Sequence, residues 1–448
     1  MRWPVHSATV TVPTRSIRFP FETRELDNGL KVILQPDHSS PVVAVHVMYH
    51  VGSRNERPGG TGFAHLFEHL LFQGSQHVAE AEHFRLIQEA GGTLNGSTWF
   101  DRTNYFETVP SHQLDLALWL EADRMGWFLP AITQAKLDNQ RDVVKNERRQ
   151  SYENRPYGLA TETVLGHAYP AGHPYRHPTI GYMEDLDRAT LEDVRRFFAT
   201  WYGPGNAVLV LCGDIDPDDA VRRVERFFGE IPAAPAPERS PVPVPTTGHP
   251  DVVRLDDSVS VPRVYQMYHA PSFPSDEYEA SALLASVLAG GRSSRLYQDL
   301  VYEQRIAADV HAFVWPLESV GMMWVVATAR PGVGADTLRS GLDTTLARLV
   351  DQPASDEEVA GARRRARRQL LLNLESVGGR ASALAHASVL RGDPEYVNAS
   401  FDRYGAVTPA DLRDLAPRLL APERRTVVEV VPRDPDARAE VLHEEGAS

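Results

Sequence analysis

The sequence of 448 residues contains a single cysteine, Cys212, which excludes an intrachain disulfide framework. No apolar run approaches the roughly 18 residues that a membrane span needs, and residues 1–6 lack the apolar core of a signal peptide. The 46 basic residues are fewer than the 60 acidic ones. The resulting net charge of −14 argues against nucleic-acid binding, because phosphate contacts need a basic surface. We therefore expect a cytoplasmic protein with no membrane span and no nucleic-acid partner.

The remaining composition is that of a soluble globular protein, with 42% hydrophobic and 24% charged residues. A chain this long exceeds what one core normally holds, so two or more domains are expected. Seven prolines fall within residues 231–250, which is too many for a helix or a sheet interior and predicts a linker. The predicted parts are an N-terminal extension (1–20), a first domain (21–231), a linker (232–250), a second domain (251–433) and a C-terminal tail (434–448).

The predicted elements on the two sides of the linker follow a similar order. In each half a strand precedes a helix, further strands and helices follow, and a threonine (Thr190 or Thr408) starts a helix that leads to the last strand. The expected strands are 42–49, 103–109 and 206–213 in the first half and 261–269, 310–315, 322–329 and 426–431 in the second. A repeat of this length indicates a duplicated α+β domain.

The most informative segment is the predicted helix at 62–72. At 100° per residue, His65, Glu68 and His69 share one face, and the opposite face is apolar. Two histidines one turn apart can bind one zinc ion, and the carboxylate beside them can take a proton from water activated by the metal. The order H-x-x-E-H is that of an inverted zinc-protease signature. The alternative is a solvated helix face, but flanking glycines and the long apolar run indicate burial, where charge needs a partner.

A third candidate ligand, Glu147, lies on another predicted helix (about 133–151). It shares a face with Val144 and Leu137, and a carboxylate on an apolar face is costly unless it is paired or bound to a metal. The alternative is a salt bridge at a helix end. The second half has no histidine between His269 and His311, so we expect the chemistry in the first half alone.

These residues resemble the pitrilysin family of zinc peptidases, which includes insulin-degrading enzyme and the mitochondrial processing peptidase. The motif His65 to His69 is followed by 77 residues and then Glu147, as in that family. The resemblance extends to residues 91–96, 103–105, 143–147, 181–186, 206–214 and 290–296. It implies an α+β fold of two homologous α/β-sandwich domains, like those of the mitochondrial processing peptidase, joined by the proline-rich linker.

The resemblance also assigns roles to individual residues. It implies that His65, His69 and Glu147 hold one zinc ion per chain and that Glu68 is the general base. Gln140 takes the place of a second family glutamate, and we expect it to orient a ligand histidine as a neutral group. The segment Asn95, Gly96 and Ser97 matches the family's substrate-binding strand edge; the alternative is a simple turn.

One departure from the family concerns the second half, which usually supplies an arginine and, seven residues later, a tyrosine to hold the substrate. Our alignment places Val301 and Ala308 there, and neither side chain donates a hydrogen bond. Tyr302 and Arg305 lie nearby in inverted order, which leaves a shifted alignment open. We therefore expect a heterodimer with a homologous chain that lacks the zinc motif and supplies the Arg/Tyr pair.

The predicted function is that of a zinc metalloendopeptidase. Its substrates would be short unstructured peptides, cleaved inside a closed chamber by zinc-activated water with Glu68 as general base. The acidic net charge favours basic peptides. The alternatives are a self-sufficient homodimeric peptidase, because symmetric homo-oligomers are common, and a non-catalytic structural subunit.

Overall fold

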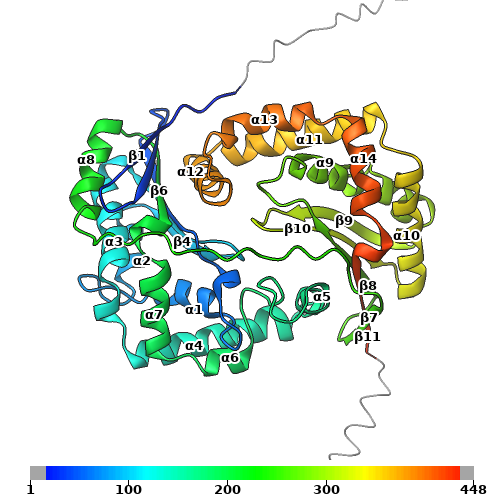
Figure 1. Ribbon diagram of the computed structural model, residues 1–448, viewed down its shortest axis with the longest axis horizontal. Coiled ribbons are helices and arrows are strands. Elements are labelled where there is room, and N and C mark those ends of the chain that lie inside the picture. Colours follow the sequence, from blue (N-terminus) through cyan, green and yellow to red (C-terminus); the bar gives the residue numbers. More distant parts are fainter. Residues whose placement is uncertain (1–16, 434–448) are drawn as a thin grey trace, which may run out of the picture.

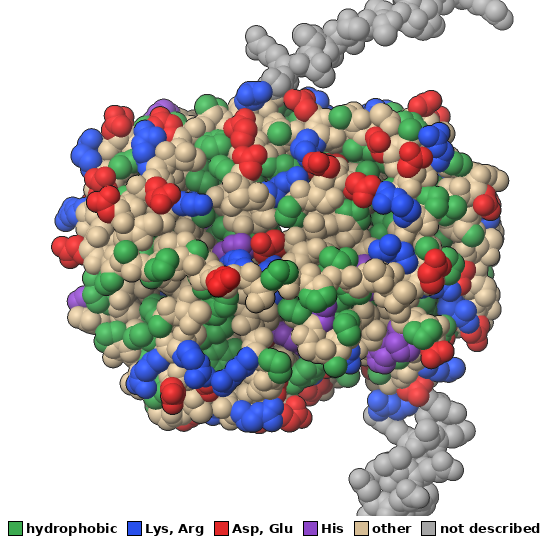
Figure 2. Space-filling view, in the orientation of Figure 1, with side chains coloured by type: hydrophobic (Ala, Val, Ile, Leu, Met, Phe, Trp, Pro, Cys, Tyr) green, Lys and Arg blue, Asp and Glu red, His purple; other side chains and the backbone are tan. Residues whose placement is uncertain are grey.

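The computed structural model describes residues 17–433 as two lobes, each built around one β-sheet (Figure 1). The predicted N-terminal extension lies mostly outside these residues, and the predicted tail lies wholly outside them. No helix between residues 17 and 433 is long and apolar enough to cross a membrane. Acidic and basic side chains are interspersed over the face shown in Figure 2.

The first sheet has six strands in the order β1-β2-β6-β3-β5-β4. The pair β2 and β6 is parallel, and the other neighbours are antiparallel. Its strand β4 is an edge strand, paired only with β5. The strands are β1 (Glu22–Glu25), β2 (Lys31–Pro36), β3 (Val42–Tyr49), β4 (Thr93–Thr98), β5 (Thr103–Pro110) and β6 (Ala207–Gly213).

The second sheet repeats this arrangement with five strands in the order β7-β11-β8-β10-β9. The parallel pair is β7 and β11, and the edge strand β9 corresponds to β4 of the first sheet. The predicted fold class, two related α+β domains in one chain, is therefore confirmed. The strands are β7 (Val252–Asp257), β8 (Arg263–Ala270), β9 (Ala307–Trp315), β10 (Gly321–Ala329) and β11 (Arg425–Pro432).

Each sheet packs one face against helices of its own half. The first set is α1 (Phe63–Leu70), α2 (Glu82–Glu89), α3 (Leu114–Trp127), α4 (Gln134–Arg148), α6 (Met183–Asp187), α7 (Leu191–Trp201) and α8 (Pro217–Phe228). The second set is α9 (Tyr278–Ala289), α10 (Ala335–Asp351), α11 (Asp356–Leu374) and α14 (Pro409–Leu419). These two apolar layers form the main core of each lobe.

The opposite face of each sheet is covered by helices that the other half of the chain supplies. Helix α5 (Ala160–Ala168) packs on β8 and β11 of the second sheet, where Val164 and Leu165 belong to one buried cluster with Trp324. Helix α12 (Val377–His386) packs on β3 and β6 of the first sheet, where Leu384 and Cys212 belong to one buried cluster, and α13 (Tyr396–Ala406) adds Phe401 to that cluster. Strands such as β6 and β10 are buried along their whole length for this reason. The halves therefore share two apolar interfaces.

The chain passes between the halves through residues 232–250, which form neither helix nor strand and run between the two lobes (Figure 1). Each predicted domain, 21–231 and 251–433, contains one of the two sheets. The helices exchanged between the halves cross this division, and the boundaries themselves stay a prediction.

Candidate active site

The helix α1 that carries the predicted ligands is fixed at its N-terminus by backbone geometry. Gly62 has φ 82°, in the left-handed region, and a Cβ there would lie 2.4 Å from the Ile180 carbonyl oxygen. The carboxylate of the buried Glu56 accepts hydrogen bonds from the Gly62 and Ala64 amides at 2.9 and 2.7 Å. These bonds satisfy N–H groups that the first turn of a helix leaves unpaired.

The chain entering α1 is held by a second carboxylate from a distant segment. Asp185 of α6 accepts hydrogen bonds from the Thr61 amide at 3.0 Å and from the Thr61 hydroxyl at 2.7 Å. The hydroxyl in turn accepts from the Tyr182 amide at 3.0 Å. Residues 181–186, singled out by the family resemblance, therefore position the helix rather than face a substrate.

The structure brings the three predicted ligands together. Oε2 of Glu147, near the end of α4, lies 3.8 Å from Nε2 of His65 and 3.4 Å from Nε2 of His69. Tetrahedral zinc with bonds of about 2.0–2.1 Å separates its ligand atoms by roughly 3.3–3.5 Å. Imidazole and carboxylate are also donors that zinc accepts. The three side chains therefore fit one zinc ion in position and in chemistry.

The protonation of these groups depends on burial and on their mutual charges. Burial, with the adjacent charge of His69, lowers the pKa of His65 to about 4, so this imidazole is neutral near pH 7. Burial also lowers the pKa of His69, but the hydrogen bond and charge of Glu147 outweigh it and raise that pKa. The hydrogen bond from His69 lowers the pKa of Glu147. A metal that binds here competes with a proton at His69.

Gln140 lies buried on α4, two turns before Glu147, and hydrogen-bonds His69. This is the contact expected of a neutral group that orients a ligand histidine.

The predicted general base, Glu68, extends its carboxylate from α1 to the edge strand β4. Burial raises its pKa, and the Thr98 hydroxyl donates a hydrogen bond of 2.7 Å to its Oε2. A Cβ at Gly96 would approach Oε1 of Glu68 to 3.3 Å, which shows how closely the strand backbone passes. Carboxylates with a raised pKa are suited to proton transfer near neutral pH.

Strand β4 has one line of backbone groups beside this carboxylate that pair with no strand, although the Gly96 amide bonds the Asn95 side chain. At the closed end of its hairpin, the Trp99 amide donates to the Arg102 carbonyl at 2.8 Å. Because paired and unpaired positions alternate in antiparallel strands, the backbone groups of Ser97 face β5, and those of Gly96 and Thr98 face the open edge. This edge can accept a further strand.

The three predicted substrate-binding residues have different surroundings. Gly96 lies against Glu68, and its amide is bonded to the Asn95 side chain at 2.9 Å. Asn95 and Ser97 point to the opposite face of the sheet, because side chains alternate along a strand. The Ser97 hydroxyl is bonded to Asn104 at 2.6 Å and contacts Arg102. The structure therefore brings Gly96 to the site and places the Asn95 and Ser97 side chains away from Glu68.

Sequence reasoning missed two polar residues of this site, Thr98 and Arg102. Arg102 donates to the Ser97 carbonyl at 2.7 Å, and burial lowers its pKa to about 10, with Glu68 acting in the opposite sense. Their position directly after the predicted substrate strand was the available signal. Neither residue type has a recognisable spacing from the zinc motif.

A cavity of about 510 Å³ opens beside His65 and Glu147 and reaches the second half of the chain. Its lining includes residues 98–100, residues 151, 152 and 155–158, and, from the second half, Arg263, Tyr265 and Trp315. The residues aligned with the family's Arg/Tyr pair do not line it. Val301 is buried in the second core, and Ala308 is exposed on β9.

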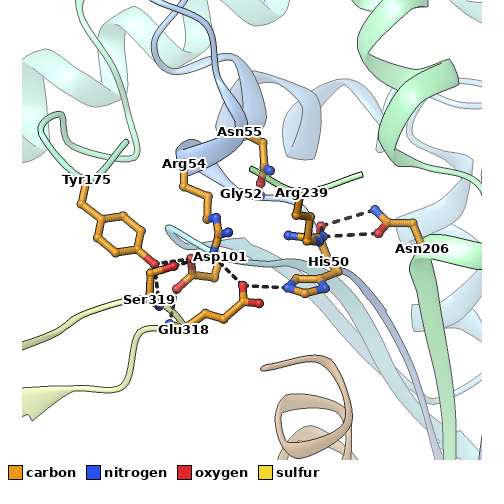
Figure 3. A network of polar contacts seen from close by, with 10 residues as sticks. All are labelled: His50, Gly52, Arg54, Asn55, Asp101, Tyr175, Asn206, Arg239, Glu318 and Ser319. Carbon is orange, nitrogen blue, oxygen red and sulfur yellow. Dashed lines mark hydrogen bonds and ion pairs between the residues drawn. The ribbon is translucent and has the colours of Figure 1, made fainter. Parts of the chain in front are cut away.

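The tip of the β4–β5 hairpin is fastened to the second half by a buried polar network (Figure 3). Asp101 accepts hydrogen bonds from Arg54 at 3.0 Å, from the Tyr175 hydroxyl at 2.6 Å and from the Glu318 amide at 2.9 Å. Arg54 also pairs with the Glu318 carboxylate at 2.6 Å, which His50 contacts at 2.9 Å. The loop between β9 and β10 therefore holds the strand that borders Glu68.

A second group of acidic and imidazole side chains, His83, Glu107 and Glu121, lies buried between α2, β5 and α3. This group already contains a cation, because Arg124 pairs with Glu121 and stacks 4.0 Å from the centre of the Tyr105 ring. Burial, followed by the charge of Glu121, raises the pKa of Glu107 well above its ordinary value. Among residues 17–433, the better metal candidate is therefore the group of His65, His69 and Glu147.

Two models of one peptidase family match the chain. The model described as "Insulinase (Peptidase family M16)" matches residues 31–179, which contain the candidate site. The model described as "Peptidase M16 inactive domain" matches residues 188–366.

Individual proteins match over most of the chain. A Helicobacter pylori protein named "Zinc protease PqqE" is 29% identical over 362 residues, 79% of this chain and 80% of its own. An uncharacterized zinc protease of Streptomyces coelicolor is 26% identical over 425 residues, 94% of this chain and 91% of its own. The crystal structure of a protease from Helicobacter pylori superposes with a TM-score of 0.86 at 27% identity, covering 92% of this chain and 99% of that one.

Proposed function

The chain belongs to the M16 family of peptidases, the family of pitrilysin and insulinase, and from this membership we propose that it is a zinc-dependent endopeptidase. The observation that carries the proposal is the convergence of His65, His69 and Glu147, with Glu68 on the same helix face. The relatives named zinc proteases support zinc as the metal.

The zinc ligands in this proposal are His65, His69 and Glu147, one ion per chain. Three protein ligands leave one position open, and zinc held in this way supplies a Lewis acid that activates water and polarises a carbonyl. Gln140 keeps the His69 ring oriented through its hydrogen bond.

The general base in this proposal is Glu68. It accepts a proton from the water that attacks the peptide carbonyl and delivers that proton to the leaving amine. Its raised pKa brings the carboxylate closer to the basicity that both transfers need, and the Thr98 hydroxyl fixes one oxygen so that the other is available.

The substrate class that suits the site is an extended, unstructured peptide. A peptide that pairs with the open edge of β4 would place its backbone beside Glu68, because Gly96 approaches that side chain closely. Recognition through main-chain hydrogen bonds selects for an extended conformation. It also favours short or flexible peptides over folded proteins.

For the assembly we propose a heterodimer in which this chain is the catalytic subunit and a homologous chain without the zinc motif supplies the Arg/Tyr pair. The substitution of that pair by Val301 and Ala308, neither of which lines the cavity, supports this arrangement. In the closed assembly the two chains would enclose a chamber around the site. The second candidate is a homodimer, favoured by the general frequency of symmetric assemblies.

The experiment combines metal analysis with peptide turnover. The purified chain should bind about one zinc ion, and Glu68→Gln should keep the metal and lose turnover. A structural subunit would show neither zinc binding nor turnover, which would refute the proposal. For the assembly, the lone chain should cleave flexible peptides poorly and gain activity with a homologous partner; full activity alone would favour the homodimer.

A further inference from the structure

The cavity beside the zinc ligands has a charge opposite to that of the whole chain. The net charge of the sequence is −14, yet the charged residues lining the cavity are Arg155, Arg263 and Glu147, apart from His65. Glu147 belongs to the proposed metal site. A ligand in the cavity would therefore meet the two positively charged guanidinium groups of Arg155 and Arg263.

Arg263 of β8 is held rigidly and, among residues 17–433, without a carboxylate partner. Its guanidinium lies 3.9 Å from the centre of the Tyr157 ring, and its Nε donates to the Thr328 hydroxyl at 2.9 Å. Nη1 is 3.4 Å from the Tyr265 hydroxyl. Asp309 accepts from the Thr328 hydroxyl at 3.0 Å and forms no ion pair with Arg263. Of the five N–H donors of the guanidinium, most therefore remain available.

The ring under Arg263 is fixed at a conformational cost. Tyr157 has φ 61°, a left-handed conformation that is strained for a residue with a side chain. Its amide donates to Asp257 at 2.7 Å and its hydroxyl to the Val261 carbonyl at 2.9 Å, both in the second half. Arg155 lies two residues earlier on the same turn, is exposed, and has no side-chain partner among the described residues.

One part of the remaining wall is aromatic. Trp99, at the end of β4, packs edge-on against Trp315, at the end of β9, with ring centres 5.0 Å apart. Phe100 packs against the same tryptophan at 6.1 Å. The cavity thus combines two cations with a wall of aromatic rings on one side.

We propose that this cavity is a specificity subsite for a carboxylate of the bound peptide, with Arg263 as its main ligand and Arg155 in support. The inference rests on the proposed peptidase function and adds a substrate class to it. The carboxylate comes either from an aspartate or glutamate side chain near the scissile bond or from the peptide's free C-terminus. The expectation of basic peptides, based on net charge, is replaced because local charge governs recognition at short range.

The test uses four versions of one flexible peptide, with an internal Glu or Gln and with a free or amidated C-terminus. The wild-type chain should prefer a carboxylate version by about tenfold in kcat/KM, as expected for a charge-assisted hydrogen bond. A Glu/Gln difference identifies the side chain as the source, and an acid/amide difference identifies the C-terminus. No preference in either comparison would overturn the subsite.

Substitutions then assign the preference to residues. Arg263→Gln should abolish it and Arg263→Lys should keep part of it, whereas Arg155→Gln, at an exposed position, should weaken it by about threefold. The matched control is Arg413→Gln on α14, because Arg413 is exposed and its ion pair is with its neighbour Asp414. A preference that persists in Arg263→Gln and in Arg155→Gln would contradict the assignment.

A binding measurement separates this inference from the proposed function. Fluorescence anisotropy of the labelled peptides with metal-free Glu68→Gln should show the same preference for the carboxylate version, since no zinc is present to attract it. Absence of turnover by the zinc-loaded wild-type chain, both alone and with a homologous partner, together with an intact binding preference, would refute the peptidase and keep the subsite. Turnover of the peptides without any preference in binding would refute the subsite and keep the peptidase.

Discussion

The two halves of the chain share a strand order. They differ in the helix that follows β3 in the first half and β8 in the second. In the first half, β3 leads into α1, which carries His65, Glu68 and His69. In the second half, β8 leads into α9, which has no histidine. The same fold therefore supports a candidate metal site in one half and only packing in the other. The proposed chemistry depends on a few side chains added to a shared scaffold.

The edge strands show the same division. The open edge of β4 passes beside Glu68, whereas the corresponding strand β9 contributes Trp315 to the wall of the cavity. The second half thus has the role of holding and lining a site that the first half forms. The Asp101 network joins the two roles, because it fixes the β4 hairpin to the loop after β9.

The largest effect is expected from a substitution of Glu68, one of the residues that distinguish the first half from the second. Glu68→Gln should lower kcat for peptide cleavage by about 10²–10⁴-fold, the range for loss of a general base, and leave bound zinc unchanged. Turnover by a zinc-loaded sample and metal analysis on the same preparation give the result. The exposed Glu303→Gln in the second half is the matched control, and an equal loss there would contradict the assignment.

The next largest effect concerns the Asp101 network that joins the two halves. Arg54→Ala leaves the buried Asp101 without its cation and should lower the free energy of unfolding by about 3–5 kcal/mol. Urea denaturation measures it.

Arg57→Ala is the control for this loss. Arg57 pairs with Asp193 from a side chain that is 63% exposed, so its removal should cost less than about 1 kcal/mol. Equal losses in the two variants would show that the buried network adds nothing to the stability of the chain.

The sequence predicted the candidate site of the first half better than the way in which the halves meet. The helical period of α1 and the apolar face of α4, both local patterns, made His65, His69 and Glu147 candidates, and the family resemblance assigned them as ligands. Strand β4, with the sequence TLNGST, lacks the β-branched and aromatic density of a typical strand and was found only through the family resemblance. The exchanged helices α5 and α12 and the Arg263 cavity depend on long-range packing that no local pattern records.

A smaller effect concerns the orientation of a ligand in the first half. Gln140→Ala removes the hydrogen bond to His69 and should weaken zinc affinity by about 10–100-fold without abolishing it. Competition with a zinc chelator provides the measurement. Gln140→Glu restores a hydrogen-bond acceptor and should recover affinity; a change of less than twofold in both variants would remove Gln140 from the site.

The smallest expected effect is the change in zinc affinity for each unit of pH. His69 has a raised pKa, so as pH falls through that value a proton competes with the metal, and affinity should fall by about tenfold per pH unit. His65, with a pKa of about 4, should add no second proton until the solution is much more acidic. Chelator competition across pH should give a slope near one, and a slope near two would mean that both histidines are protonated together.

The central claim is most directly tested by X-ray absorption at the zinc edge on the loaded chain, combined with an anomalous difference map from its crystals. The account predicts one zinc ion bound by two imidazole nitrogens and a carboxylate oxygen from His65, His69 and Glu147, and no zinc in the second half. Zinc bound instead at His83, Glu107 and Glu121, or bound without Glu147, would contradict it.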